Sequence, residues 1–267
     1  MPVVAREDGA EVFWEATGAG TPVLLLMGLA YPAAMWFRQV PALAERHRVI
    51  VMDNRGAGHT GDVPGAPYTV ETMAADALAV LDAAGEESAH VVGISMGGLM
   101  AQELALSHRE RVRSLVLMAS HPGIVNATVP PAALELLQKR ATMTAVEAAE
   151  ASIPVNYAPS TDRSLIEEDW AVRMPLAASP AGYLAQGGTA LWNRLAELPT
   201  VTSPTLVVHG ALDGLLPPAN GETLADAIPD AKLVVVDDAN HVLTTDQAER
   251  VNALLLEWFA DRDGARP

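Results

Sequence analysis

The stretch "HVVGISMGGLMAQELAL", residues 90–106, decides how the chain is interpreted. Its first residues are apolar and its later ones have helical spacing, so a buried strand is expected to lead directly into a helix. Residues 93–97 fit G-x-S-x-G, which places Ser95 in a sharp strand-to-helix turn. Side chains in place of the flanking glycines would collide with backbone, and the strain holds the hydroxyl clear of the sheet. The pattern predicts a nucleophilic serine and disfavours a simple helix cap.

A serine hydroxyl is a weak nucleophile, so it needs a histidine base and a carboxylate that orients the base. His241, in "VVVDDANHVLTTD", follows the last strand-like run, and Asp213, in "LVVHGALDGLLPP", follows the penultimate one. Both loops are expected at the carboxyl edge of the sheet, where Ser95 would lie. We therefore predict His241 as the base and Asp213 as the acid. Asp237 and Asp238 are interpreted as the end of a strand or a turn cap.

The other histidines are predicted to have different roles. His121 follows a strand-like run and is predicted to contact substrate. Five are interpreted as structural because they lie in charged segments, in strand runs or in a glycine-rich turn: His47, His59, His90, His108 and His209.

Two backbone N–H groups are predicted to form an oxyanion hole. The first belongs to Met96, at the start of the helix that follows the serine, where free N–H groups favour negative charge. The second belongs to Leu29, in the loop "MGLAYPAAMW" after the first buried strand. Gly28 is expected to let this loop turn sharply and to lie beside the substrate.

Short apolar runs alternate with helix-like segments along much of the chain. Strands are expected at 11–18, 22–28, 48–53, 90–93, 114–119, 205–210 and 232–237, and helices at 70–85, 97–112 and 245–262. Runs that are apolar throughout fit strands buried on both faces. The alternation predicts an α/β fold with a mostly parallel central sheet, helices on both faces and an N-terminal hairpin.

This alternation stops after residue 122 and resumes at 199. We predict a core domain formed by 1–122 and 199–267, with 123–198 as a helical cap inserted into it. Six apolar cap side chains either form the cap's own core or roof a pocket: Met143, Trp170, Met174, Leu176, Tyr183 and Trp192. Packing alone is favoured for each of them, but Trp170, Met174 and Trp192 are retained as candidate substrate contacts.

Composition excludes several classes of function. The chain has no cysteine, so disulfides and thiol chemistry are excluded. Its 33 acidic and 17 basic residues give a net charge of −16, which repels nucleic acid and anionic membranes. The longest apolar stretch, 22–37, is too short and too interrupted for a membrane span, and the N-terminus does not resemble a secretory signal. A cytoplasmic protein is expected, and oligomeric state leaves no trace in the sequence.

The motifs quoted above occur in the order found in α/β-hydrolase-fold enzymes. The chain resembles this family over nearly its full length, and most closely its esterase and lactonase branch, which includes 3-oxoadipate enol-lactonases. The resemblance implies the same roles for Ser95, Asp213 and His241, and no metal or organic cofactor. Two positions depart from the family pattern: Met27 stands where many relatives have histidine, and Asn240 where they have glycine. Asn240 is expected to tolerate a left-handed turn.

The expected reaction is hydrolysis of an ester or lactone of a small, largely apolar substrate through an acyl-enzyme. The same three residues would also suit C–C bond hydrolysis, perhydrolysis or a biosynthetic cyclisation, and a non-catalytic ligand-binding protein on this fold is a further alternative. Arg55 or Arg173 could receive a substrate carboxylate, although Arg55 is expected to tie down its own turn.

Overall fold

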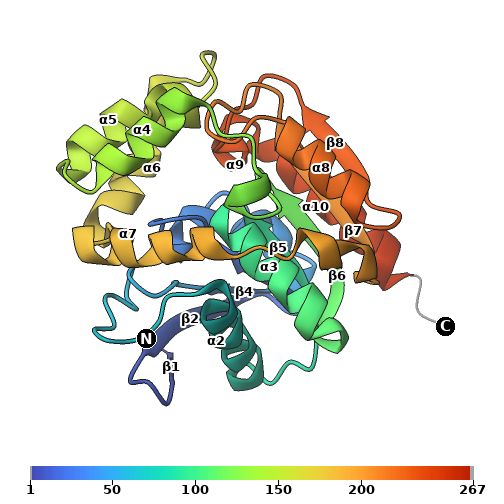
Figure 1. Cartoon of the computed structure of the whole chain (residues 1–267). Helices are drawn as coiled ribbons and strands as arrows, with labels where there is room; N and C mark the ends of the chain where they lie inside the picture. Colours follow the sequence, from blue (N-terminus) through green and yellow to red (C-terminus); the bar gives the residue numbers. More distant parts are fainter. Residues whose placement is uncertain (1, 265–267) are drawn as a thin grey trace.

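A computed structural model describes residues 2–264, which form one eight-stranded sheet covered by helices (Figure 1). The strand order is β1-β2-β4-β3-β5-β6-β7-β8. Strand β2 runs antiparallel to both of its neighbours, and the other pairs are parallel, which confirms the predicted fold class and the N-terminal hairpin. The strands are β1 Val3–Ala5, β2 Glu11–Thr17, β3 Thr21–Leu26, β4 His47–Met52, β5 Ala89–Ile94, β6 Val112–Met118, β7 Thr205–Gly210 and β8 Lys232–Val236.

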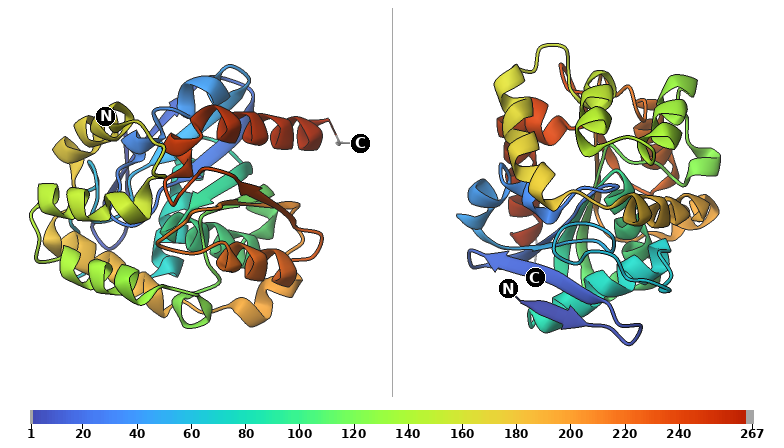
Figure 2. Two further views of the ribbon diagram at one scale, coloured as in Figure 1. Left: turned by 90° about the horizontal axis from the view of Figure 1, so that it is seen from above. Right: turned by 90° about the vertical axis from the view of Figure 1, so that its left-hand side faces the viewer.

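Helices cover both faces of this sheet (Figure 2). Alternate residues of β3 explain why its sequence is apolar throughout: Leu24 and Leu26 pack against α2 and α3, whereas Val23 and Leu25 face the side of α1 and α10. The helices of the core are α1 Val40–Ala44, α2 Val70–Ala83, α3 Met96–Ser107, α8 Ala219–Ala227, α9 Leu243–Asp246 and α10 Ala248–Asp263.

The helix predicted over 245–262 is divided in the structure. Gln247, with φ of −133°, separates α9 from α10. The carboxylate of Asp246, the last residue of α9, accepts hydrogen bonds from the N–H of Asn240 at 2.7 Å and of Ala158 at 3.1 Å. The break therefore places a carboxylate between the loop of the predicted base and the cap.

Two other predicted features differ in detail. The helix predicted over 97–112 ends at Ser107, because His108 leaves the helical conformation with φ of −141° and ψ of 49°. The run at 232–237 forms β8, but this strand is half-exposed because it lies at the edge of the sheet.

The segment between β6 and β7 rises above the carboxyl ends of the parallel strands (Figure 1). Its later part returns to the main body, because Trp192 and Leu198 belong to the same hydrophobic core as β3 and α3. The cap helices are α4 Pro131–Arg140, α5 Ala145–Asn156, α6 Arg163–Arg173 and α7 Pro180–Gln186, and short 3-10 helices occupy Ala33–Trp36, Arg109–Arg111, Ile124–Asn126, Met174–Leu176, Gly187–Leu191 and Leu195–Thr200.

A buried arginine joins the core to the cap. Arg55 is 1% exposed, and its Nε and Nη2 atoms donate to the two carboxylate oxygens of Asp76 at 2.5 and 2.8 Å. It also pairs with Asp8, and its carbonyl accepts a hydrogen bond from Gln186 of α7 at 2.6 Å. Arg55 thus ties down its own turn, as the sequence indicated, and it does not line the cavity beside Ser95.

Removing one partner of this pair should destabilise the fold strongly. We expect Asp76→Asn to lower the free energy of unfolding by about 3–5 kcal/mol, because the guanidinium of Arg55 would stay buried without its bidentate partner and with only the half-buried Asp8 as a counter-charge. Urea unfolding measures the loss. The control is Asp82→Asn, which lies on the same helix but is 65% exposed in its pair with Arg111. A loss at Asp76 no larger than at Asp82 would contradict this account.

Candidate active site

Ser95 occupies a strained turn between β5 and α3. Its backbone has φ of 54° and ψ of −119°, a conformation that costs free energy and persists only when its surroundings enforce it. The N–H of Ser95 donates to the carbonyl of Met118 at 2.9 Å. The carbonyl of Ser95 accepts from Ser120 Oγ at 2.8 Å and from the N–H of Gly98 at 2.9 Å. The side chain makes no capping bond to α3, so its hydroxyl is free.

Close backbone packing around this turn requires glycine. A Cβ atom at residue 93 would lie 2.2 Å from the carbonyl oxygen of Gly97, and one at Gly97 would lie 2.2 Å from that of Leu26. These distances confirm the prediction that side chains at 93 and 97 would collide with backbone. Gly98 is equally constrained, since its Cβ would lie 2.2 Å from Ser120 Oγ, but no sequence pattern indicates this contact.

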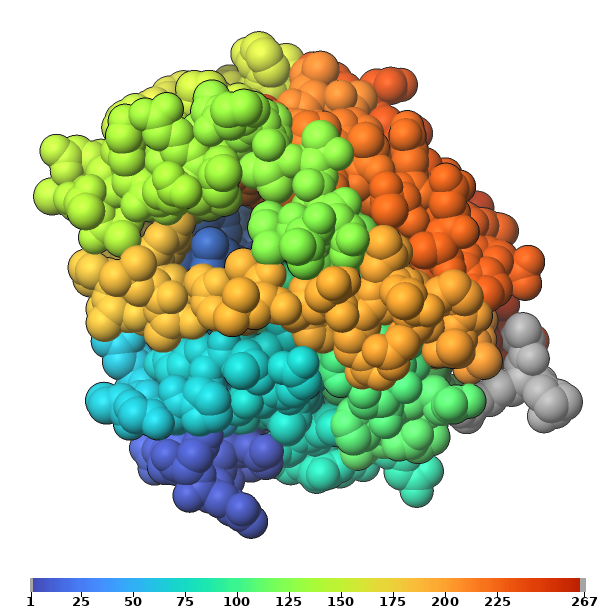
Figure 3. All heavy atoms as spheres, in the orientation of Figure 1, coloured from blue at the N-terminus to red at the C-terminus, as the bar shows by residue number. Residues whose placement is uncertain are grey.

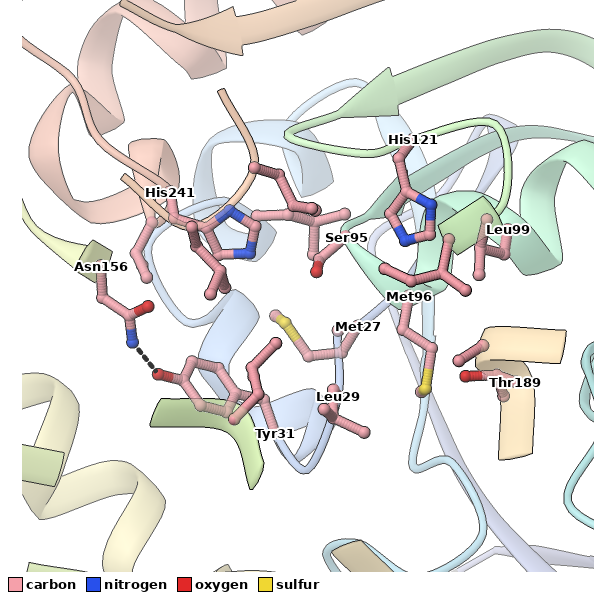
Figure 4. Close-up of a pocket in the computed structure, with 18 of the residues that line it drawn as sticks. Met27, Leu29, Tyr31, Ser95, Met96, Leu99, His121, Asn156, Thr189 and His241 are labelled. Carbon is pink, nitrogen blue, oxygen red and sulfur yellow. Dashed lines mark hydrogen bonds between the residues drawn. The ribbon is translucent and has the colours of Figure 1, made fainter. Parts of the chain in front are cut away.

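The predicted base and acid are hydrogen-bonded to each other. Nδ1 of His241 lies 2.9 Å from Oδ2 of Asp213. The other carboxylate oxygen of Asp213 accepts the N–H groups of Leu215 at 3.0 Å and Leu216 at 2.8 Å. A carboxylate only accepts, so Nδ1 donates its proton to Asp213, and in the neutral ring the lone pair of His241 is at Nε2. Ser95 and His241 line the same cavity and face each other across it (Figure 4).

A second histidine also contacts the acid. Nε2 of His209 lies 3.3 Å from Oδ2 of Asp213 and 2.7 Å from the carbonyl oxygen of Leu216. Burial alone would raise the pKa of Asp213, but the charge and hydrogen bonds of the two histidines outweigh it and hold the pKa at about 2. Asp213 therefore remains ionised over the whole range in which a histidine base can act. Sequence reasoning had treated His209 as structural only.

The two predicted oxyanion donors line the cavity beside Ser95. The N–H of Leu29 has no acceptor within residues 2–264, and Met96 is the first residue of α3, where N–H groups lack helical partners. The expected role of Gly28 needs correction, because Ala30, with φ of 63°, makes the sharp turn. A side chain at residue 28 would be crowded, since a Cβ there would lie 3.1 Å from that of Ser95.

The loop of the predicted oxyanion donor is held by the cap. Gln186 of α7 is fully buried, and its Oε1 accepts the N–H of Ala30 at 2.6 Å while its Nε2 donates to the carbonyl of Arg55. This residue joins three segments that are distant in sequence. No local pattern around residue 186 indicated it.

Asn240 does not adopt the left-handed conformation expected for it. Its side chain instead connects three loops. Oδ1 accepts the N–H groups of His241 at 2.8 Å and of Gly214 at 2.9 Å, and Nδ2 donates to the carbonyls of Pro154 at 3.2 Å and Tyr157 at 2.9 Å. An asparagine at this position therefore fixes the base and the acid loop to each other and to the cap.

The cavity next to Ser95 has a volume of about 150 Å³ and is mostly apolar. Of the predicted contacts, Gly28 and His121 line it. The rings of His121 and His241 lie on opposite sides of Ser95 (Figure 4). The apolar wall is formed by Met27, Leu29, Met35, Ile94, Met96, Leu99, Ile124, Val129, Leu137, Ala190, Leu215, Leu216 and Val242.

The three predicted cap contacts do not reach this cavity. Met174 lines a neighbouring cavity. Trp192 is buried in the main core, where its Nε1 donates to Glu103 at 2.8 Å. Trp170 packs against a small cluster that includes Tyr157 and is covered by a guanidinium. Both tryptophans therefore serve packing, and neither is proposed as a substrate contact.

Burial keeps His121 neutral. It is 7% exposed, and burial lowers its pKa to about 4, with the backbone of Gly123 acting in the opposite direction and the charge of His241 adding to the lowering. At neutral pH its ring is therefore an uncharged donor and acceptor at the cavity wall.

No group of three or more metal-ligating side chains lies together in residues 2–264. In the same part of the chain, no helix has the length and apolar character needed to cross a membrane.

A mostly parallel sheet, a strained serine after its central strand, and an acid and a histidine on the loops of later strands define an α/β-hydrolase type of protein. The chain belongs to the alpha/beta hydrolase fold family, which matches residues 21–247.

Known members of this family carry several activities. A curated relative from Azorhizobium caulinodans, provisionally named as the carbamate hydrolase RutD, is 32% identical over 98% of this chain and 100% of its own. A thermophilic esterase from Thermogutta terrifontis, solved with malate bound, is 31% identical, with a TM-score of 0.84 over 97% of each chain. The enol-lactonase from Burkholderia xenovorans is 25% identical, with a TM-score of 0.84 over 97% of this chain and 100% of its own.

The buried histidines make stability depend on pH. Burial lowers the pKa of His121 and of His90 to about 4, from an ordinary value of 6.5. The unfolded chain therefore takes up protons below about pH 6.5, whereas the folded chain resists until about pH 4. We expect the free energy of unfolding to decrease as the pH is lowered from about 6.5 to about 4, by up to ~1.4 kcal/mol per pH unit for each histidine. Urea titrations at several pH values test this, and His121→Gln should make the slope shallower. An unchanged slope in that variant would contradict the assignment.

The hydrogen bonds of Asn240 are expected to stabilise the folded protein. Asn240→Ala should lower the free energy of unfolding by about 1–3 kcal/mol, because four backbone groups at buried or partly buried sites lose a partner. Asn193→Ala, at a site where the side chain bonds only another exposed side chain, is the control. Chemical denaturation compares the two, and an equal effect of both would show that the Asn240 side chain does not join the loops energetically.

Proposed function

We propose that this protein is a serine hydrolase that cleaves a carboxylic ester or lactone of a small, largely apolar substrate. Ser95 is the nucleophile, His241 the base and Asp213 the group that orients the base. The N–H groups of Leu29 and Met96 bind the oxyanion. The esterase and lactonase activities in the names of similar solved structures support this choice of reaction.

One observation carries the proposal. His241 is held through Nδ1 by a buried, ionised Asp213, so that its lone pair at Nε2 faces the cavity that contains the free hydroxyl of Ser95. A serine that only capped its helix would hydrogen-bond to a backbone N–H of α3, and Ser95 does not.

In the first half of the reaction, Nε2 of His241 takes the proton of Ser95 Oγ while that oxygen attacks the carbonyl carbon. The carbonyl π bond opens, and its electron pair moves to the oxygen beside Leu29 and Met96, where two backbone donors stabilise the charge. The tetrahedral species then collapses, the C–O bond to the alcohol breaks, and His241 gives its proton to the departing oxygen. The product of this half is an ester of Ser95.

In the second half, water replaces the alcohol. His241 removes a proton from the water as its oxygen attacks the acyl carbon, and the same two N–H groups bind the new oxyanion. Collapse breaks the bond to Ser95 Oγ, which recovers its proton from His241. The ionised Asp213 stabilises the imidazolium formed in each half.

The size and lining of the cavity indicate the substrate. Cavities of about 150 Å³ hold a molecule of roughly the size of benzene, so the group beside Ser95 is short. Methionine, leucine and isoleucine side chains form most of the wall, and no acidic side chain lines it. His121 supplies a neutral polar group on the side opposite His241. A short apolar acyl group fits these surroundings.

Replacement of the serine tests the proposal. We expect Ser95→Ala to reduce kcat for short-chain 4-nitrophenyl esters by about 10⁴-fold or more, since the covalent step is lost. A fluorophosphonate should label Ser95 in the native protein, and mass spectrometry of the digested protein locates the label. Ser164→Ala, at an exposed cap serine, is the matched control and should behave like the native protein.

Undiminished ester hydrolysis by the Ser95→Ala protein would overturn the proposal. A panel of esters, lactones and 1,3-diketones separates ester or lactone cleavage from C–C bond cleavage. Tight binding of a panel member without turnover, in a protein that the fluorophosphonate does not label, would favour a non-catalytic binding protein instead.

A further inference from the structure

A second cavity adjoins the one beside Ser95. It has a volume of about 230 Å³ and lies between α4, α5 and α7, over the loop that follows β3. Tyr31 and Arg140 line both cavities, so the two cavities adjoin at these side chains. The hollow is visible between the yellow-green and gold segments of the cap, with blue atoms of the early chain inside it (Figure 3). A substrate with its carbonyl at Ser95 can therefore extend into this hollow.

Two arginines line this second cavity, and neither forms an ion pair within residues 2–264. The guanidinium groups of Arg140 and Arg173 make no ion pair and no hydrogen bond within residues 2–264. Arg173 is only 7% exposed, and the Nε atom of Arg140 is buried without a partner. Burial of an unpaired cation costs free energy, so such groups are usually found in ion pairs. An unpaired guanidinium at a cavity wall is therefore a candidate site for an anionic ligand.

Aromatic rings hold both guanidinium groups in place. Arg173 lies over the ring of Tyr31, 4.7 Å from its centroid, and Arg140 lies 5.2 Å from that of Tyr183. The hydroxyl of Tyr31 is itself fixed, because it accepts a hydrogen bond from Nδ2 of Asn156 at 2.9 Å (Figure 4). Such stacking uses the faces of the guanidinium groups and leaves their N–H edges free for a planar anion.

The charges around these arginines favour binding of an anion. The chain has 33 acidic residues against 17 basic ones, yet no Asp or Glu lines either cavity. Asp169 is within electrostatic range of Arg173, but its oxygens already pair with Arg38 at 2.9 Å and accept from Thr245 at 2.7 Å. Two cations and no anion therefore face a cavity in a strongly acidic protein.

We propose that Arg140 and Arg173 form an anion subsite that binds a carboxylate of the substrate, remote from the bond that is cleaved. The substrate class is then an ester or lactone whose apolar body ends in a carboxylate. This inference rests on the proposed function only for the position of the scissile carbonyl. It takes up the role that the sequence left open for Arg173: the overall negative charge disfavours anions at long range, but the local charge at this cavity attracts them.

The test compares paired substrates. One series consists of mono-4-nitrophenyl esters of dicarboxylic acids from succinic to suberic acid, and the other carries a neutral primary amide in place of the free carboxylate. At the chain length that spans the two cavities, we expect kcat/KM to be about 10- to 100-fold higher for the acid than for the amide, as for a charged hydrogen-bonded pair. This ratio should fall to about one in Arg173→Met and in Arg140→Met. The control is Arg250→Met, which removes an exposed arginine of α10 and should leave the ratio unchanged.

A ratio near one at every chain length in the native protein, or a high ratio that survives both substitutions, would overturn the subsite. Because each ratio compares two substrates in one variant, a general loss of activity does not imitate the expected result.

Calorimetric binding of the free dicarboxylates to the Ser95→Ala protein tests the subsite without hydrolysis. Binding that requires both Arg140 and Arg173 supports it, and binding unaffected by their replacement overturns it. Absence of ester cleavage and of Ser95 labelling, together with arginine-dependent binding, would refute the hydrolase and retain the anion subsite.

Discussion

The enforced backbone of Ser95 is the constraint on which the rest of the site depends. A residue with φ of 54° and ψ of −119° keeps this conformation only if its neighbours allow nothing else. Met118 at the end of β6 and Ser120 in the loop after it supply that enforcement, and glycines at 93 and 97 permit the close packing of β3, β5 and α3. The same packing brings the start of α3 against the loop after β3. The hydroxyl of Ser95 and the N–H of Met96 are therefore positioned by one local arrangement, whereas the loop that carries the N–H of Leu29 is also held by Gln186 of the cap.

Parts of the fold and site with a local sequence signal could be predicted. Runs that are apolar throughout gave the parallel strands, because both faces of such strands are buried. Asp213 and His241 could be chosen because loops after parallel strands meet at one edge of the sheet, and few polar residues there suit the chemistry. The loop proposed to bind the oxyanion was predicted by the same reasoning, although its sharp turn lies at Ala30 and not at Gly28.

Features that depend on contacts between distant segments could not be predicted. Asn240 looked like a turn residue, but its four hydrogen bonds go to the acid loop, its own loop and the cap. His209 lies in a strand whose sequence shows burial but not its contact with Asp213. Trp170 and Trp192 were predicted to contact substrate, but both pack in hydrophobic clusters. An aromatic residue in a cap indicates burial, but it does not indicate whether a core or a pocket lies beside it.

Gln186, which hydrogen-bonds the cap to the core, limits how the cap can be exchanged in engineered variants. The cap is the natural segment to exchange when a different substrate range is wanted, since it carries the arginines and much of the outer wall. Gln186 lies on that segment, yet its amide completes the hydrogen bonding of Ala30 and of the Arg55 carbonyl in the core. A transplanted cap that lacks an amide at this position would leave both groups unpaired beside the loop of Leu29. Chimeras should therefore retain Gln186 or exchange α7 together with the loop that it supports.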